Sequence, residues 1–334
     1  MICETSGPDP EMNPAELLRD QTQTTRHVLM VRPSHFGPNS QTAASNQFQQ
    51  ITAHSAAELS LRAMREFDVV VAALGREGVQ TFVVADIPDN GTPDAVFPNN
   101  WFSTHDDGTV VLYPMATANR RAERRADILD LLAAEGGFRV NRTIDLSWLE
   151  NSGRYLEGTG SLVLDRPHRT AFATRSARTH QEALGEFARL TGYRVVAFSA
   201  SIDTRRVYHT NVLMSLGQRF AVLCSDAITD PTERRTVCAE LAATNRSLVV
   251  ISGGQVRQFA ANCLELDSPG GPVLVLSETA LQSLRPEQRR TLERYTALLP
   301  VDVATIEHVG GGSVRCMLAE IYLPRSAQLD CQSV

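Results

Sequence analysis

The segment GGGSVRC at 310–316 holds the cysteine with the most distinctive surroundings in the chain. Three glycines allow backbone conformations and close approaches that other residues forbid, and they deliver Cys316 to the start of a predicted strand. A neighbouring cation, here Arg315, stabilises the thiolate, which is the nucleophilic form of cysteine. Cys316 is therefore a candidate nucleophile, although a glycine turn followed by a buried cysteine would have the same sequence.

A histidine and a glutamate stand in segments that suit acid–base and binding chemistry. In YHTN at 208–211, His209 lies where a loop enters an apolar strand and could be a general acid/base, with Asn211 on the same side of an extended chain. In LEGTG at 156–160, Glu157 stands beside a G-x-G pattern that lacks the context and the third glycine of a dinucleotide site. A surface histidine and a turn glutamate are the alternative interpretations.

These residue types together indicate one kind of reaction. The loop FPNNW at 97–101 adds two amides in a proline-stiffened segment, which is typical of a polar pocket wall. A thiolate can attack a planar, nitrogen-rich carbon while an imidazole moves protons to the leaving amine and from water. Carboxylate and amide side chains can hold the N–H and C=O groups of the substrate in plane. This chemistry requires neither a metal nor an organic cofactor.

Short strands and helices must position these residues. Apolar, β-branched runs predict strands at 27–32, 80–85, 109–114, 161–165, 170–174, 212–216, 220–223, 247–251, 263–266, 273–276, 301–306 and 317–321. Helices are predicted at 55–76 and 179–190, each opened by a capping box, at 119–135 with a basic outer face, after Asp230-Pro231, and at 277–298. Units of the β-β-α-β type recur. They predict an α/β protein with several short mixed sheets rather than one doubly wound sheet.

The domain organisation is predicted to be simple. Residues 1–25 are polar and rich in Pro, Gln, Thr and Asp, which favours a flexible N-terminal tail. No Ser/Gly/Pro-rich linker divides the rest, so residues 26–334 are expected to form a single catalytic domain. The six cysteines show no C-x-x-C pair and no regular spacing, which argues against a disulfide framework or a structural zinc site.

Composition and charge exclude several classes of partner. The 334 residues are 43% hydrophobic and 21% charged, with 32 basic and 38 acidic side chains and a net charge of −6. No positive field attracts nucleic acid or anionic lipid, so a small molecule is the expected partner. The apolar runs are far shorter than the roughly 18–20 residues of a membrane helix. The first residues lack the features of a signal peptide, so we expect a cytoplasmic protein.

Five ordered segments of the chain resemble the pentein superfamily, the guanidino-group-modifying enzymes that include arginine deiminases, dimethylarginine hydrolases and amidinotransferases. The similarity is closest to the citrulline-utilization hydrolases and runs from about Met30 to Pro324. It rests on MVRPSHFGPNSQTAASNQFQ (30–49), VFPNNWFSTH (96–105), GRYLEGTGSLVLDR (153–166), YHTNVLMSLG (208–217) and GGGSVRCMLAEIYLP (310–324).

The resemblance implies a fold and three catalytic roles. The fold is an α/β propeller of five ββαβ modules around a pseudo-fivefold axis, with the site in the central channel. Cys316 matches the nucleophile, His209 the general acid/base, and Glu157 the carboxylate that orients the substrate nitrogens. Asn46 matches an asparagine of related arginine dihydrolases and citrulline hydrolases.

Two departures from the family pattern bear on the substrate. Asn100 and Asn211 stand where related enzymes have aspartates, so two negative charges are absent from the pocket. An asparagine donates as well as accepts and can therefore bind a ureido C=O, which an ionised aspartate would repel. We expect hydrolysis of citrulline to ornithine, ammonia and carbon dioxide. Arginine dihydrolase or arginine deiminase activity, amidinotransfer, and a catalytically dead amino-acid-binding protein are the alternatives.

The α-carboxylate and α-amine of such a substrate need partners as well. Arg178 and Arg154 are candidates for a bidentate carboxylate clamp, and Asp203 for the amine, although solvated arginines at element ends are an equal alternative. Asn262 is expected to cap a turn rather than to touch substrate. A homodimer would be unsurprising, but no sequence feature indicates one.

Overall fold

The computed structural model describes residues 22–50, 52–88 and 90–325. Most of the predicted N-terminal tail, residues 1–21, lies outside these ranges. The predicted end of the tail at residue 25 is wrong, because Gln23–Thr25 are buried. The Gln23 side chain donates to the Leu164 carbonyl at 2.9 Å and accepts from the Arg166 amide at 3.0 Å. These bonds fix the start of the described chain to another part of the molecule.

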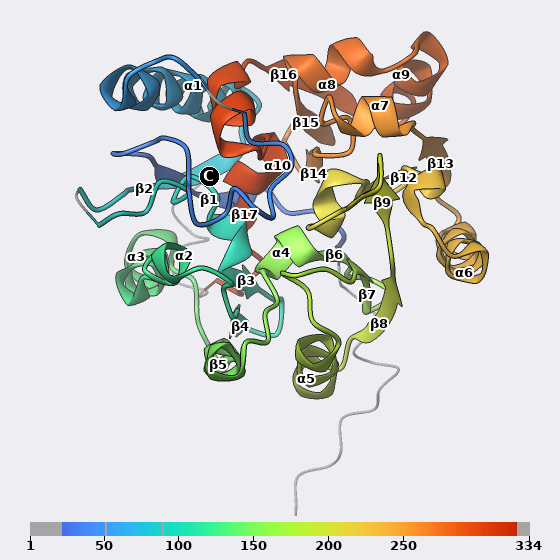
Figure 1. Cartoon of the computed structure of the whole chain (residues 1–334), viewed down its shortest axis with the longest axis horizontal. Helices are drawn as coiled ribbons and strands as arrows, with labels where there is room; N and C mark the ends of the chain where they lie inside the picture. The colour runs from blue at the N-terminus through green and yellow to red at the C-terminus, as the bar shows by residue number, and fades with distance from the viewer. Residues whose placement is uncertain (1–21, 51, 89, 326–334) are drawn as a thin grey trace, which may run out of the picture.

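Five three-stranded sheets share one pairing pattern, in which the middle strand is antiparallel to one neighbour and parallel to the other. In sheet order they are β17 (Ala319–Glu320), β1 (His27–Arg32) and β2 (Gln80–Ala85); β3 (Phe102–Thr104), β4 (Thr109–Leu112) and β5 (Arg142–Asp145); β6 (Leu162–Asp165), β7 (Thr170–Thr174) and β8 (Arg194–Phe198); β11 (Met214–Leu216), β12 (Phe220–Leu223) and β13 (Ser247–Val250); β14 (Leu264–Leu266), β15 (Val273–Ser277) and β16 (Ala297–Val301). Figure 1 shows these sheets arranged around a common centre. β9 (Ser201–Ile202) and β10 (Arg205–Arg206) form a separate hairpin.

Helices connect the two parallel strands of each sheet and lie on the outside of the ring (Figure 1). A parallel pair needs such a crossover, because a tight turn cannot join its strands. The crossovers are α1 (Ala56–Arg76), α2 (Ala118–Arg121) with α3 (Ala126–Gly136), α5 (Gln181–Thr191), α6 (Pro231–Ala242), and α8 (Glu278–Ser283) with α9 (Pro286–Glu293). The predicted α/β class with recurring ββαβ modules is therefore confirmed.

Each module has a short turn directly before the edge strand that pairs antiparallel with the middle strand of its sheet. These turns are η1 (Pro98–Asn100), α4 (Gly158–Ser161), η3 (Thr210–Val212), the turn 259–262 after α7 (Gly253–Val256), and α10 (Val314–Met317). The helices α4 and α10 contact η1, and α4 also contacts η3. The remaining short helices are η2 (Ser147–Ser152), η4 (Ser225–Ala227) and the π-helical η5 (Ile306–Gly310).

Several predicted elements differ from the structure. The helix predicted at 119–135 is two helices, and the strand predicted at 301–306 is wrong because β16 already ends at Val301. Cys316 lies in the one-turn helix α10 rather than at the start of a strand. The predicted capping box at Thr179 is wrong as well: His180 is the N-cap of α5, and the Thr179 hydroxyl bonds instead to Ser161 Oγ at 2.8 Å.

The hydrophobic core is divided into four clusters that lie between neighbouring sheets and their outer helices. α1 shows how the sequence produces this packing. Ser55 and Glu58 form the predicted capping box, and Leu59, Phe67 and Leu74 face inward at helical spacing. Across the described ranges no helix has the length and apolar character to cross a membrane.

Candidate active site

Polar and reactive side chains from all five modules meet near the centre of the ring. Five residues stand in or beside the turns that precede the antiparallel edge strands, and each is nine-tenths or more buried: Asn100, Glu157, Asn211, Asn262 and Cys316. Residues far apart in the sequence come together because each module contributes one such turn to the centre of the ring.

Cys316 receives hydrogen bonds from two amides. Nδ2 of Asn211 lies 3.4 Å from its Sγ atom and Nδ2 of Asn262 lies 3.3 Å from it. Two N–H donors directed at one sulfur stabilise negative charge there. Arg315, predicted to do this, does not: its guanidinium donates to the Leu318 carbonyl at 3.0 Å and to Glu320 at 2.8 Å. The interpretation that Arg315 activates the cysteine is therefore wrong; the sulfur instead contacts both asparagines, with Asn262 Oδ1 at 3.6 Å as well.

His209 and Glu157 form a buried pair, with Nε2 and Oε2 2.8 Å apart and exposed fractions of 3% and 0%. Burial opposes ionisation of Glu157, but the Arg178 guanidinium, 3.4 Å away, and His209 outweigh it and hold the pKa of the carboxyl well below its usual range. Burial lowers the pKa of His209 to about 4 although Glu157 opposes the change. The imidazole is therefore neutral and the carboxylate ionised near neutral pH.

The two glycines after Glu157 allow this close arrangement. A Cβ atom on Gly158, whose φ is +42°, would lie 2.3 Å from the Asn99 carbonyl oxygen. One on Gly160 would lie 2.4 Å from Asn100 Nδ2 and 2.7 Å from His209 Nδ1. The G-x-G pattern thus serves the packing of three modules around the site.

Asn100 and Asn211 each leave one polar atom unpaired in the buried site. Asn100 Oδ1 accepts from Arg120 Nη1 at 2.7 Å, and Asn211 Nδ2 donates to Cys316. Within the part of the chain that the structure describes, the buried atoms Asn100 Nδ2 and Asn211 Oδ1 have no hydrogen-bond partner. Buried polar groups are nearly always paired. The site therefore presents one unused donor and one unused acceptor.

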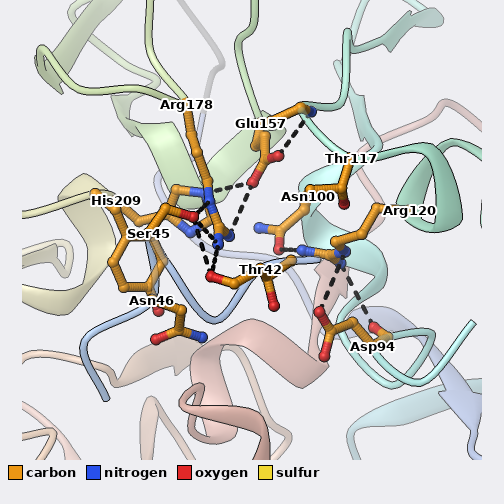
Figure 2. A network of polar contacts seen from close by, with 12 residues as sticks. Thr42, Ser45, Asn46, Asp94, Asn100, Thr117, Arg120, Glu157, Arg178 and His209 are labelled. Carbon is orange, nitrogen blue, oxygen red and sulfur yellow. Dashed lines mark hydrogen bonds and ion pairs between the residues drawn. The ribbon is translucent and has the colours of Figure 1, made fainter. Parts of the chain in front are cut away.

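The covering segment, residues 39–50, brings Thr42 and Ser45 beside Arg178 (Figure 2). Arg178 Nη2 donates to Ser45 Oγ at 2.7 Å and to the Thr42 carbonyl at 3.3 Å. Asn46 Nδ2 donates to the Gly310 carbonyl at 2.9 Å, beside the glycine turn that leads to Cys316. Asn46 and Arg178 therefore join the covering segment to Gly310 and to Glu157.

A cleft of about 560 Å³ opens between this segment and the β9–β10 hairpin. Ser45, Asn46 and Tyr208 line its inner side, and Arg205 and Arg206 line the hairpin side. The rings of Tyr208 and His209 pack against each other at a tilt of 48°, with centroids 4.6 Å apart. Cys316 itself is only 5% exposed. Neither Cys316 nor Glu157 lines this cleft, which therefore lies beside the site without opening onto the sulfur.

Two residues predicted from the sequence do not join the site. The side chain of Arg154 is exposed and, within the described residues, forms no hydrogen bond or ion pair with the site, so it makes no clamp with Arg178. Asp203 is exposed on the β9–β10 hairpin and pairs with Arg257. Both residues are exposed, whereas the site is built from buried turns.

Two buried residues of the site went unrecognised in the sequence. Asn262, expected to cap a turn, contacts Cys316. The sequence does contain a signal for Asn262: it precedes the edge strand β14 by two residues, as Asn100 precedes β3. Arg120 lies on a helix whose basic residues predict a solvated face, and nothing local distinguishes it from its neighbours.

Comparisons with known proteins agree with this geometry. The family model described as N,N dimethylarginine dimethylhydrolase, eukaryotic, matches residues 32–323. No curated protein matches the chain. The N-terminal domain of ArgZ, an arginine dihydrolase from the ornithine–ammonia cycle in Cyanobacteria, was solved with bound substrate and superposes with a TM-score of 0.68. It is 16% identical over 89% of this chain and 99% of its own.

Two further solved structures share the fold. AgrE in its ternary complex with ornithine and NAD+ is 17% identical with a TM-score of 0.69, over 90% of this chain and 40% of its own. A histidine-to-glycine variant of dimethylarginine dimethylaminohydrolase, as an adduct with S-methyl-L-thiocitrulline, is 15% identical with a TM-score of 0.58. That match covers 89% of this chain and 99% of the other. At such identities the likeness is one of fold.

Proposed function

Because the chain belongs to the pentein superfamily of guanidino-group-modifying enzymes and matches its dimethylarginine dimethylhydrolase family, we propose that it hydrolyses the ureido group of citrulline. The products would be ornithine, ammonia and carbon dioxide. One observation supports this choice above others: Asn100 Oδ1 is bonded to Arg120, and its unpaired amide donor remains for the substrate.

The two unused groups of the site fit a ureido group better than a guanidinium. A guanidinium offers only N–H donors, so it has no acceptor for Asn100 Nδ2. A ureido oxygen accepts from Asn100 Nδ2, while a ureido N–H donates to Asn211 Oδ1. A buried polar group without a partner costs about 1–3 kcal/mol. That cost would weigh against arginine at Asn100.

Cys316, His209 and Glu157 would then perform the covalent chemistry. His209 accepts the thiol proton, and the Cys316 sulfur forms a bond to the ureido carbon. Ammonia leaves with a proton from His209, and an N-alkyl thiocarbamate remains on the sulfur. Water, deprotonated by His209, attacks this carbon and breaks the C–S bond. The released carbamate decomposes to ornithine and carbon dioxide, so one water is consumed for each citrulline.

Glu157 and the residues of the covering segment would hold the substrate. The ionised Glu157 carboxylate can accept from ureido N–H groups, and charge-assisted hydrogen bonds are roughly twice as strong as neutral ones. Arg178, which bonds to both Glu157 and Ser45, would meet the substrate carboxylate. Asn46 would fix that segment against Gly310.

Arginine is the second candidate substrate, and one observation favours it. Glu157 is ionised and fully buried, so the site contains a negative charge that suits a guanidinium. Hydrolysis of arginine would first give citrulline and ammonia. The amides of Asn100 and Asn211 could then hold the citrulline for a second hydrolysis, as an arginine dihydrolase requires.

The test is to measure ammonia, ornithine and citrulline released from citrulline and from arginine in parallel. Ornithine from citrulline, with a lower kcat/KM for arginine, would support the proposal, and Cys316→Ala should abolish turnover. Deimination of arginine without turnover of citrulline would overturn it. Guanidino products in the presence of added glycine or lysine would indicate amidinotransfer instead.

A further inference from the structure

We infer that Arg120 is a positioning residue that makes the site select a carbonyl oxygen, because it fixes the direction of the Asn100 amide. The inference rests on the function proposed above, since it assigns substrate selection at the same site to a residue that the substrate does not touch. Arg120 lies on α2 in the crossover that follows Asn100 and reaches back under it (Figure 2).

The Arg120 guanidinium is held by several buried acceptors. Its Nε and Nη2 atoms donate to the two carboxylate oxygens of Glu123 at 2.9 and 2.8 Å, and Nη2 also donates to the Phe97 carbonyl at 3.2 Å. The side chain is 2% exposed, and Asp94 lies 3.9 Å from Nε. Two carboxylates and a carbonyl therefore fix the guanidinium, with Nη1 directed at Asn100.

This arrangement allows only one orientation of the Asn100 amide. Arginine has donors and no acceptor, so the atom at 2.7 Å from Nη1 must be the carbonyl oxygen. The reverse orientation would set two N–H groups against each other in a buried place. Nδ2 is therefore turned toward the other side, where no partner within the described ranges meets it.

The direction of this amide decides which substrate atom it can meet. A free asparagine could rotate and accept an N–H of a guanidinium as readily as it donates to a ureido oxygen. Arg120 removes the first option. The neutral amide of Asn100 thus presents only its donor to the substrate. The discrimination between citrulline and arginine would therefore depend on Arg120, which does not touch the substrate.

The competing explanation is that Arg120 only stabilises the fold through its buried ion pair with Glu123. Arg246 offers a matched control, because it is also buried and forms an ion pair with Asp165, at 2.6 Å, but contacts no residue of the site. Arg120→Met and Arg246→Met should cost stability in the same way. Only the first should change the preference between substrates.

The experiment measures the ratio of kcat/KM for citrulline to that for arginine in a double-mutant cycle. Arg120→Met should lower this ratio at least about tenfold, while Arg120→Lys, which keeps a cationic donor, should restore most of it. In the Asn100→Ala background, Arg120→Met should leave the ratio unchanged, because no amide remains to be oriented. Arg246→Met should leave it unchanged in either background.

Two results would overturn the inference. One is an Arg120→Met variant that loses activity on both substrates equally, as a structural role predicts. The other is an equal change of the ratio with and without the Asn100 side chain. If Arg120→Met does not fold, Glu123→Gln replaces it in the cycle. This substitution weakens the ion pair that holds Arg120, so it should also lower the ratio of kcat/KM for citrulline to that for arginine.

Failure of the proposed function would be separately visible. It would show as a wild-type protein that prefers arginine or turns over neither compound, whatever the variants do. The same cycle is then run on the Cys316→Ala protein by calorimetry with citrulline and arginine as ligands. Coupling between positions 120 and 100 in the ratio of Kd values would support the role of Arg120, and its absence would refute it.

Discussion

The Nε2 atom of His209 lies 2.8 Å from Oε2 of Glu157, so imidazole and carboxylate are joined directly. Because the ionised carboxylate can only accept, Nε2 holds the ring proton and Nδ1 is the basic nitrogen. Nδ1 faces Gly160, on the side of Asn100 Nδ2. Glu157 therefore sets the tautomer of the histidine as well as the charge of the site.

This pair leads to a prediction about pH. Neutral His209 is needed to accept the thiol proton, and burial lowers its pKa to about 4. We expect kcat/KM to stay level as the pH falls to about 5 and to decline only near pH 4. A decline centred near the ordinary histidine value of 6.5 would contradict the assignment.

Stability must be followed in the same pH series. The unfolded histidine binds its proton near 6.5 and the folded one near 4, so the unfolded state takes up more protons in this window. His209 therefore contributes stability that is fully present above about pH 6.5 and is lost as the pH falls towards 4. Circular dichroism at each pH separates unfolding from titration of the catalytic group.

Asn100→Asp should shift the preference of the enzyme toward arginine. One carboxylate oxygen would bind Arg120, and the other would attract a guanidinium and repel a ureido oxygen. We expect the ratio of kcat/KM for arginine to that for citrulline to rise at least about tenfold. Asn99→Asp is the control, because it adds the same charge one residue away on a side chain that bonds to Thr159. Equal effects of both substitutions would argue against the specific contact.

Asn262→Ala should lower the reactivity of Cys316. The substitution removes one of two N–H donors to the sulfur and so weakens the stabilisation of the thiolate. We expect iodoacetamide to alkylate Cys316 about tenfold more slowly, as measured by peptide mass spectrometry that separates it from the other cysteines. Asn141→Ala, at an exposed asparagine, is the matched control. An unchanged alkylation rate in Asn262→Ala would show that this amide does not contribute to the reactivity of Cys316.

Gly160→Ala should abolish most activity. The new Cβ would lie within 2.4 Å of Asn100 Nδ2 and 2.7 Å of His209 Nδ1, so both groups must move. Gly185 on α5 provides the contrast, because a Cβ there meets nothing within 4 Å. Gly185→Ala should leave activity intact and add roughly 0.5–1 kcal/mol to the free energy of unfolding. Steady-state kinetics and denaturant titration of both variants check this, and an active Gly160→Ala enzyme would refute the packing described.

The sequence predicts most of the strands and the ββαβ modules, because alternating β-branched runs and capping residues are local signals. The capping boxes illustrate the limit. Ser55 caps α1 as expected, but the same motif at Thr179 fails since its hydroxyl bonds to Ser161 from another turn. A tertiary contact overrides the local pattern there.

The site was predictable only where its residues carry a local signal in the sequence. Cys316, His209 and Glu157 stand in segments with unusual local composition. Arg120 does not: the sequence places it on a continuous helix with a basic outer face, yet the helix is interrupted and this one arginine is buried. Its role depends on Glu123 and Asn100, one near and one far along the chain, and no periodicity encodes that combination.

The pairing of β17 with β1 has a consequence for biosynthesis. Val28 and Leu29 lie opposite Glu320 and Ala319, so the sheet that begins the ring is completed by the last strand described. Cys316 stands three residues before that strand. A ribosome-bound chain can assemble the middle modules as they emerge, but it cannot hold a reactive thiol in its pocket until translation has passed this point. Under the proposed function, the nascent chain would gain its activity only when the whole ring is complete.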